Sequence, residues 1–315
     1  MVRLNIYGIH IPLLYLTILL ILWWRGNTSA FEITNWVIWI NFVSCIVIVI
    51  LLNWDGTLFV SRPDWSLAKP LLRFGSQSLI GSIPEYLNAR LDQLILTAVV
   101  NPAALGLYAV SVTWSLTLGA MLSPLATLMF PRIAGAYTEE GAQAKFAQSV
   151  RATIILTSGF GTLLLAITPF SMRLLLGHQF EPAIPTAMVL VLASMIWQVN
   201  TIMKWGLRGL GKPFGTAWGE GIGLVITVVL LYLLLPSYGI MGAAFASLIA
   251  YCASLIALTS FTLSSSNLSL HDIFLPRRQD FFAIATVVTE ALHSINNAVT
   301  RSGQTVLNQS ERRDE

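Results

Sequence analysis

Residues 221–258 read GIGLVITVVL LYLLLPSYGI MGAAFASLIA YCASLIAL and contain no Asp, Glu, Lys or Arg. Pro236 and Gly239 divide this run into two stretches, each near the roughly 20 apolar residues that an α-helix needs to cross a bilayer. The run therefore predicts two membrane-spanning helices, over residues 216–236 and 239–262.

The composition of the whole chain agrees with this local pattern. Of the 315 residues, 55% are hydrophobic and 10% are charged, whereas soluble domains contain about 25% charged residues. Six further apolar runs lie at residues 9–24, 34–54, 75–100, 103–130, 150–170 and 183–205. We therefore expect an all-α polytopic membrane protein with about eight transmembrane helices. The same composition excludes a soluble enzyme, a disordered chain and a nucleic-acid-binding protein.

The basic residues predict the orientation of these helices. With eight spans, fifteen of the 18 Lys and Arg residues lie on one side, Arg25 and Arg173 lie on the other, and Arg90 lies within a span. Cytoplasmic loops carry an excess of Lys and Arg, so both termini are expected in the cytoplasm. The membrane is expected to be the inner membrane of the cell.

The loops also predict a domain organisation. We expect two transmembrane helices over 1–54, a cytoplasmic linker over 55–72, a six-helix lobe over 73–262 and a polar cytoplasmic tail over 263–315. Apolar residues between 281 and 299 are spaced for an amphipathic surface helix. Residues 137–149 are expected to form a polar cytoplasmic loop with a separate interfacial helix.

Charged side chains inside an apolar helix are costly, so each one marks a contact or a function. Five polar residues in or just before the third run fall within one arc of about 120° on a helix that turns by about 100° per residue. They are Arg73, Gln77, Glu85, Asn88 and Asp92. Such a stripe faces either a watery cavity, which we favour, or a helix–helix interface held by polar contacts. Pro84 predicts a kink in the same helix.

Four other charged residues lie in or near the spans. Arg90 lies off the stripe and needs a partner on another helix, a bound anion or a route to the outer surface. Glu220 lies near the cytoplasmic end of its span and Arg90 lies in the outer half of its own, which argues against a direct pair. Lys204 and Arg208 end another span on the cytoplasmic side, where they could anchor lipid headgroups or admit an anionic headgroup.

The sequence carries no signature of catalysis. It contains no HExxH, GxSxG or Walker motif. Cys45 and Cys252 lie in apolar runs and lack the spacing of a disulfide framework or a metal site. We therefore expect no metal ion, no cofactor and no enzymatic activity.

Five short segments stand in order between residues 71 and 262. They are RLDQ at 90–93, LGLYAV at 105–110, LGHQFEPA at 176–183, LRGLGKP at 207–213 and YGIMGAA at 238–244. In this order and spacing they resemble the second half of the polysaccharide and O-antigen flippases. These flippases belong to the multidrug/oligosaccharidyl-lipid/polysaccharide exporter superfamily.

The resemblance implies a V-shaped transporter of two six-helix lobes. The cavity between the lobes would accept an oligosaccharide on an undecaprenyl pyrophosphate carrier and turn its headgroup across the membrane by alternating access. Asp92 matches an acidic position of the family. Arg90, Lys204 and Arg208 become candidates for contacting the anionic pyrophosphate. Coupling to a proton or sodium ion would fall to the carboxylates Glu85, Asp92 and Glu220.

The chain departs from the family pattern in its number of helices. The family has at least twelve spans, so four amino-terminal helices are expected to be missing, and lobes cannot rock about a central site with one lobe alone. We therefore expect membrane lipids and a chain that supplies the missing helices as partners. Three alternatives stay open: a cation-coupled drug exporter of the same superfamily, a membrane glycosyltransferase or polymerase, and a non-transporting member of a glycan-assembly complex.

Overall fold

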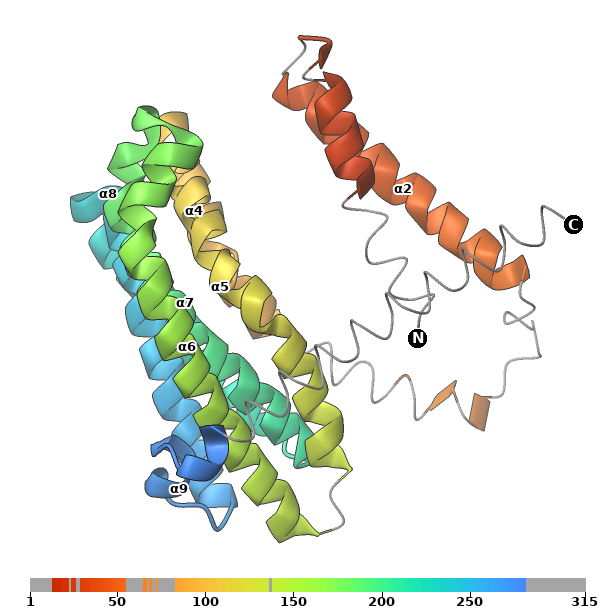
Figure 1. Cartoon of the computed structure of the whole chain (residues 1–315), viewed down its shortest axis with the longest axis vertical. Coiled ribbons are helices and arrows are strands. Elements are labelled where there is room, and N and C mark those ends of the chain that lie inside the picture. The colour runs from red at the N-terminus through yellow and green to blue at the C-terminus, as the bar shows by residue number, and fades with distance from the viewer. Residues whose placement is uncertain are drawn as a thin grey trace, which may run out of the picture. The chain divides into compact units, whose positions relative to one another are not determined.

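The computed structural model describes residues 13–22, 24–26, 29–54, 65–66, 68–69, 72, 83–135 and 138–281. The chain divides into two compact units, Met1–Leu72 and Arg73–Glu315. The first unit contains a helix over Leu13–Leu22 and α2 (Ala30–Trp54) (Figure 1). The Asn41 side chain on α2 donates a hydrogen bond to the Tyr15 hydroxyl of the preceding helix.

The second unit consists of helices throughout its described residues, drawn from yellow to blue in Figure 1. A helical segment over 83–88 precedes the named elements. These are α4 (Leu91–Val99), α5 (Pro102–Ala134), α6 (Glu139–Leu176), the 3-10 helix η1 (His178–Ala183), α7 (Ile184–Gly209), α8 (Phe214–Ser265) and α9 (Leu270–Phe274). Four stretches of this unit are long and apolar enough to cross a membrane, and they lie in α5, α6, η1–α7 and α8. The all-α polytopic fold predicted from the sequence is confirmed.

Helix α8 is a helical hairpin. Its 52 residues would extend over roughly 78 Å as one straight helix, more than twice the thickness of a bilayer core. Gly239 interrupts the helix with φ +54° and ψ −135°, a backbone conformation that glycine adopts without steric cost. In Figure 1 the chain of α8 turns back at one end of the second unit. The two predicted spans over 216–236 and 239–262 are the two arms of this hairpin.

Helix α6 corrects one expectation from the sequence. Residues 139–149 do not form a separate interfacial helix, since they are the first three turns of α6. The Thr138 side chain caps this helix by accepting a hydrogen bond from the Gly141 backbone N–H at 3.1 Å. Phe146 and Val150 are fully buried in a core cluster with Met203 of α7. This burial keeps the polar segment in line with the apolar span that follows it.

Helix α7 is central to this unit, because it packs against α5, α6, η1 and α8. Its contact with α6 depends on a glycine. A Cβ atom added to Gly206 would lie 2.0 Å from a ring carbon of Phe146. The absence of a side chain at Gly206 therefore allows the aromatic ring to pack directly on the α7 backbone.

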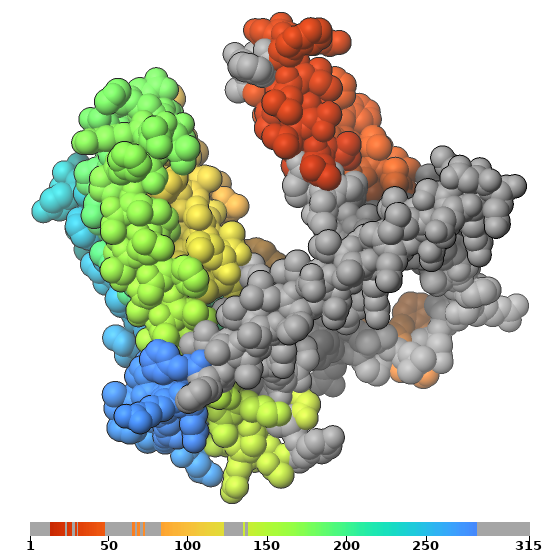
Figure 2. Space-filling model, viewed as in Figure 1, coloured from red at the N-terminus to blue at the C-terminus, as the bar shows by residue number. Residues whose placement is uncertain are grey.

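The segment after α8 is tied to α6 by a buried ion pair. Helix α9 packs against α6, and Figure 2 shows it in blue at one end of this unit. The Arg151 guanidinium donates to both carboxylate oxygens of Asp280, at 2.7 and 3.0 Å, and also to the backbone carbonyl of Asp272. The Asp280 side chain is fully buried. The segment from α9 to Asp280 is therefore held to α6 by charge as well as by packing.

The ion pair sets the protonation state of its carboxylate. Burial alone would raise the pKa of Asp280, but hydrogen bonds from Arg151 and from the Arg277 backbone N–H outweigh it and hold this pKa below its usual range. The surface helix expected over 281–299 lies, apart from Phe281, outside the described residues.

We predict that Gly206→Ala lowers the free energy of unfolding by about 1–3 kcal/mol, because the new methyl group overpacks the α6–α7 contact. Thermal unfolding of the purified chain in detergent measures this effect. Gly159→Ala on α6 is the matched control, since a Cβ there meets nothing within 4 Å. Equal melting temperatures for the two variants would contradict the prediction.

We predict that Asp280→Asn destabilises the chain by about 3 kcal/mol at neutral pH, because it leaves Arg151 buried without its carboxylate. Because the pKa of Asp280 is lower in the folded state, the stabilisation is complete above about pH 4 and declines as the pH falls through the folded pKa. The difference in melting temperature between wild type and variant should therefore shrink only in acid. A difference that stays constant down to pH values below the normal Asp pKa would argue against this ion pair.

Candidate functional site

The candidate site is built around a buried lysine. Lys204 lies on α7 and its side chain is 1% exposed. Its Nζ atom lies 2.7 Å from Oε1 of Glu220 on α8 and 2.9 Å from Oε1 of Glu85 on the 83–88 segment. The same nitrogen lies 4.4 Å from the centre of the Trp197 ring. An ammonium has three donors, and here two point to carboxylates and the aromatic face covers the remaining side.

The hairpin formed by α7 and α8 explains why Lys204 meets Glu220. Gly211, with φ +73°, lies in the short connection between the two helices. Lys204 precedes this glycine by seven residues and Glu220 follows it by nine, so the two side chains reach the same depth on antiparallel helices. Gly223, one turn further along α8, lets the Asn88 side chain approach to 3.1 Å from the place where a Cβ atom would stand.

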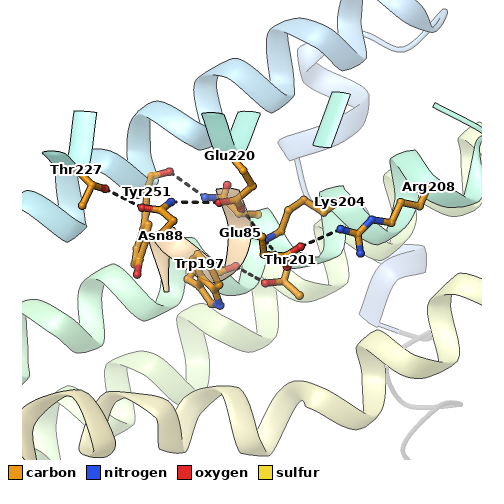
Figure 3. A network of polar contacts seen from close by, with 10 residues as sticks. Glu85, Asn88, Trp197, Thr201, Lys204, Arg208, Glu220, Thr227 and Tyr251 are labelled. Carbon is orange, nitrogen blue, oxygen red and sulfur yellow. Dashed lines mark hydrogen bonds and ion pairs between the residues drawn. The ribbon is translucent and has the colours of Figure 1, made fainter. Parts of the chain in front are cut away.

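Polar contacts continue from Lys204 in both directions and form what we call the Lys204 network (Figure 3). Its members are Glu85, Asn88, Lys204, Arg208, Glu220 and Thr227. At the more buried end of the network, Asn88 donates to Glu220 at 3.2 Å and accepts from Thr227 at 2.8 Å. At the more exposed end, Arg208 donates to Oε2 of Glu85 at 2.9 Å.

The Lys204 network is electrically balanced and has one exposed end. Two carboxylates face two cations, which compensates the high cost of placing charges in an apolar interior. Glu220 is fully buried, whereas the side chains of Glu85 and Arg208 are each 26% exposed. The network therefore connects a buried ion pair to a partly exposed ion pair.

Asp92 forms a second polar site, separate from the Lys204 network. It is buried on α4, where one carboxylate oxygen accepts from the Tyr108 hydroxyl and the other accepts from the Gln93 backbone N–H at 2.7 Å. Tyr108 is itself fully buried in α5. Both of these donors are neutral groups, so the surroundings of Asp92 differ from those of Glu85 and Glu220.

The predicted polar stripe is only partly realised. The helix expected over 75–100 is interrupted by a turn at Ala89 and Arg90, where the Arg90 N–H bonds to the Leu87 carbonyl three residues back. Glu85 and Asn88 therefore lie on one helical segment and Asp92 on another. Arg90 is exposed, and its guanidinium donates to the Gln93 side chain at 3.3 Å.

The structure also bears on the remaining predicted residues. Lys204 is buried against two carboxylates, so it does not lie exposed as an anchor for headgroups of the surrounding bilayer would. Arg73 and Gln77 lie outside the described residues. Among the residues that the structure describes, no group of three His, Cys, Asp or Glu could hold a metal ion.

Three residues of the site were missed by the reasoning from sequence: Trp197, Tyr108 and Thr227. Trp197 precedes Lys204 by seven residues, so helical periodicity places both on one face of α7 and could have identified this pair. The Trp197 ring also packs against the Tyr251 ring of α8, with 4.8 Å between the ring centres and a tilt of 49° between the ring planes. The contact of Thr227 with Asn88 joins elements 139 residues apart in sequence and had no local signal, whereas Tyr108 reaches Asp92 on the preceding helix.

We predict that Lys204→Met destabilises the chain by roughly 3 kcal/mol, because Glu220 is left buried without a cation. Adding Glu220→Gln to this variant should recover part of the loss, since the double variant contains no unpaired buried charge at this position. Melting temperatures of the two single variants and the double variant measure the coupling. Strictly additive losses would show that Lys204 and Glu220 do not stabilise each other.

Comparisons with known proteins agree with this architecture. The family model described as "Polysaccharide biosynthesis protein" matches residues 3–185, more than half of the chain. The probable low-salt glycan biosynthesis flippase Agl15 of Haloferax volcanii is 22% identical over 204 residues, which cover 62% of this chain and 42% of that protein.

Solved structures of MATE proteins are similar in fold. A MATE crystal structure in the bent conformation matches with a TM-score of 0.51 and 23% identity, over 69% of this chain and 50% of that chain. A MATE crystal structure in the straight conformation matches with a TM-score of 0.52 and 22% identity, over 68% and 49%. The chain spans half or less of the length of these relatives. This chain is a multi-pass membrane protein that belongs to the polysaccharide biosynthesis protein family.

Proposed function

We propose that the chain takes part in flipping lipid-linked oligosaccharides across the membrane for polysaccharide biosynthesis. The observation that carries this proposal is the pair of cations, Lys204 and Arg208, one helical turn apart in an apolar helical lobe. A lipid-linked oligosaccharide carries an anionic diphosphate between its sugar and its lipid. Two neighbouring cations can attract such a headgroup inside a membrane protein once a carboxylate that pairs with them moves away.

The proposal includes an alternating-access mechanism with a second lobe. Because the relatives are about twice as long, the remaining helices would come from another chain or from sequence outside these 315 residues. The lobe described here would move relative to those helices and expose the headgroup to each side of the membrane in turn. We also propose that the lipid carrier is undecaprenyl pyrophosphate, that the membrane is the bacterial inner membrane and that both termini lie in the cytoplasm.

Asp92 supports a second candidate, the cation-coupled drug exporter. It is a buried carboxylate whose hydrogen-bond donors, Tyr108 and the Gln93 backbone, are neutral. Such a carboxylate could bind a proton, a sodium ion or a cationic substrate. In the flippase that we propose, Asp92 carries the coupling ion, whereas in a drug exporter it would contact the substrate.

Deletion of the gene in the organism that encodes the chain tests the proposal. Loss of a flippase leaves the completed lipid-linked oligosaccharide accumulating on the cytoplasmic face while surface glycan falls. Loss of a glycosyltransferase or polymerase instead yields an incomplete oligosaccharide. A drug exporter would leave glycans unchanged and increase sensitivity to cationic compounds, and that result would overturn the proposal. A role as a non-transporting scaffold predicts that a variant lacking the charges of the Lys204 network still restores surface glycan.

We predict that Asp92→Asn abolishes glycan export while the protein is still made. The amide oxygen can accept from the Gln93 backbone N–H and the amide NH2 can donate to the Tyr108 hydroxyl, so both contacts have a partner, but the amide cannot be ionised. Surface glycan in the deletion strain carrying this variant is the measurement, with membrane abundance as the control. Export equal to wild type would exclude Asp92 as the coupling site.

A further inference from the structure

Glu85 holds two cations with the two oxygens of one carboxylate. Oε1 lies 2.9 Å from Lys204 Nζ and Oε2 lies 2.9 Å from Arg208 Nη2. A phosphate group also presents two oxygens from one central atom, and Lys and Arg are its usual protein partners. Glu85 therefore occupies the position that a phosphate would take between these two cations.

The two carboxylates of the Lys204 network differ in how easily each can move away from the cations that it pairs with. Glu220 is fully buried and is held by both Lys204 and Asn88. Glu85 is 26% exposed, and its ion-pair partners are the two cations. An anion arriving from outside could therefore replace Glu85 without disturbing Glu220.

Both cations keep a partner when Glu85 leaves. Lys204 retains Glu220 at 2.7 Å and the ring of Trp197. The Arg208 guanidinium lies 5.2 Å from the centre of the Trp205 ring, which can support its charge. Without Glu85, the two cations face one carboxylate and have a surplus positive charge that favours an anionic ligand.

We infer that Lys204 and Arg208 form a diphosphate seat and that Glu85 is its built-in competitor, which the headgroup displaces. This inference rests on the proposed function and deepens it by naming the residue that sets the affinity. Glu85 makes binding weaker than the two cations alone would give, so the headgroup can also be released. Displacement would free Glu85 on the 83–88 segment, while Asn88 continues to hold that segment to Glu220 and Thr227.

Binding measurements on the purified full chain in detergent test the inference. The probes are inorganic pyrophosphate and farnesyl diphosphate, titrated by calorimetry at low ionic strength because salt screens such contacts. We expect Glu85→Gln to lower the Kd for both probes about tenfold, a change equivalent to the loss of one competing charge contact. Tighter binding of farnesyl diphosphate than of pyrophosphate assigns the seat to a lipid headgroup, and equal binding assigns it to free diphosphate.

Two further variants make the result specific. Glu181→Gln removes the same charge from η1, where Glu181 contacts Arg173 at 3.2 Å, and should leave the Kd unchanged. Adding Arg208→Gln to Glu85→Gln should abolish the gain in affinity, because the seat then retains a single cation. Melting temperatures of all variants verify that each one is folded.

The outcomes separate this inference from the proposed function. Equal Kd values for wild type and Glu85→Gln would overturn the role of Glu85 as a competitor of the diphosphate. The deletion phenotype would still test the proposed function independently. No diphosphate binding by either protein would overturn both the seat and the diphosphate substrate. A gain of about tenfold that Arg208→Gln removes would support both.

Discussion

The burial of the Lys204 ammonium is the constraint on which the functional part of this structure depends. An isolated charge in an apolar interior is prohibitively costly, so Lys204 must have a carboxylate at the same depth. Glu220 meets this requirement because α7 and α8 form an antiparallel hairpin. Glu85 then joins the same lysine from the 83–88 segment. One buried cation therefore joins the consecutive helices α7 and α8 to a segment that lies more than 100 residues earlier in the chain, since Glu85 and Lys204 are 119 residues apart.

The packing around this ion pair is adapted to it. Small residues on α8 allow the Asn88 side chain to reach Glu220, and the Trp197 ring covers the open side of the lysine. The charges balance inside the Lys204 network, and Glu85 and Arg208 are its partly exposed members. In the mechanism that we propose, a fixed inner pair with an exchangeable Glu85 carboxylate would let the transporter bind a charged headgroup and then release it.

The turn at Ala89 and Arg90 separates two kinds of carboxylate that the sequence placed on one stripe. Glu85 lies on the side of the cations, whereas Asp92 is buried against the neutral hydroxyl of Tyr108. This separation allows different roles for the two groups in the proposed mechanism. Glu85 competes with the headgroup for its cations, and Asp92 binds the coupling ion.

The sequence by itself determined the fold class, the apolar spans found in α5, α6, α7 and α8, and the residue types of the site. Long uncharged runs have few alternatives to membrane helices, because every backbone polar group in lipid must be satisfied internally. The sequence could also point to Glu85, Asn88, Lys204 and Arg208, because charged or polar residues in such runs are rare. Only the tertiary structure decided which of them meet. The pairing of Lys204 with Glu220 and Glu85 depends on the depth and rotation of packed helices, which local periodicity does not specify. The break at Ala89 and Arg90, which places Asp92 outside the Lys204 network, had no signal within the stripe itself.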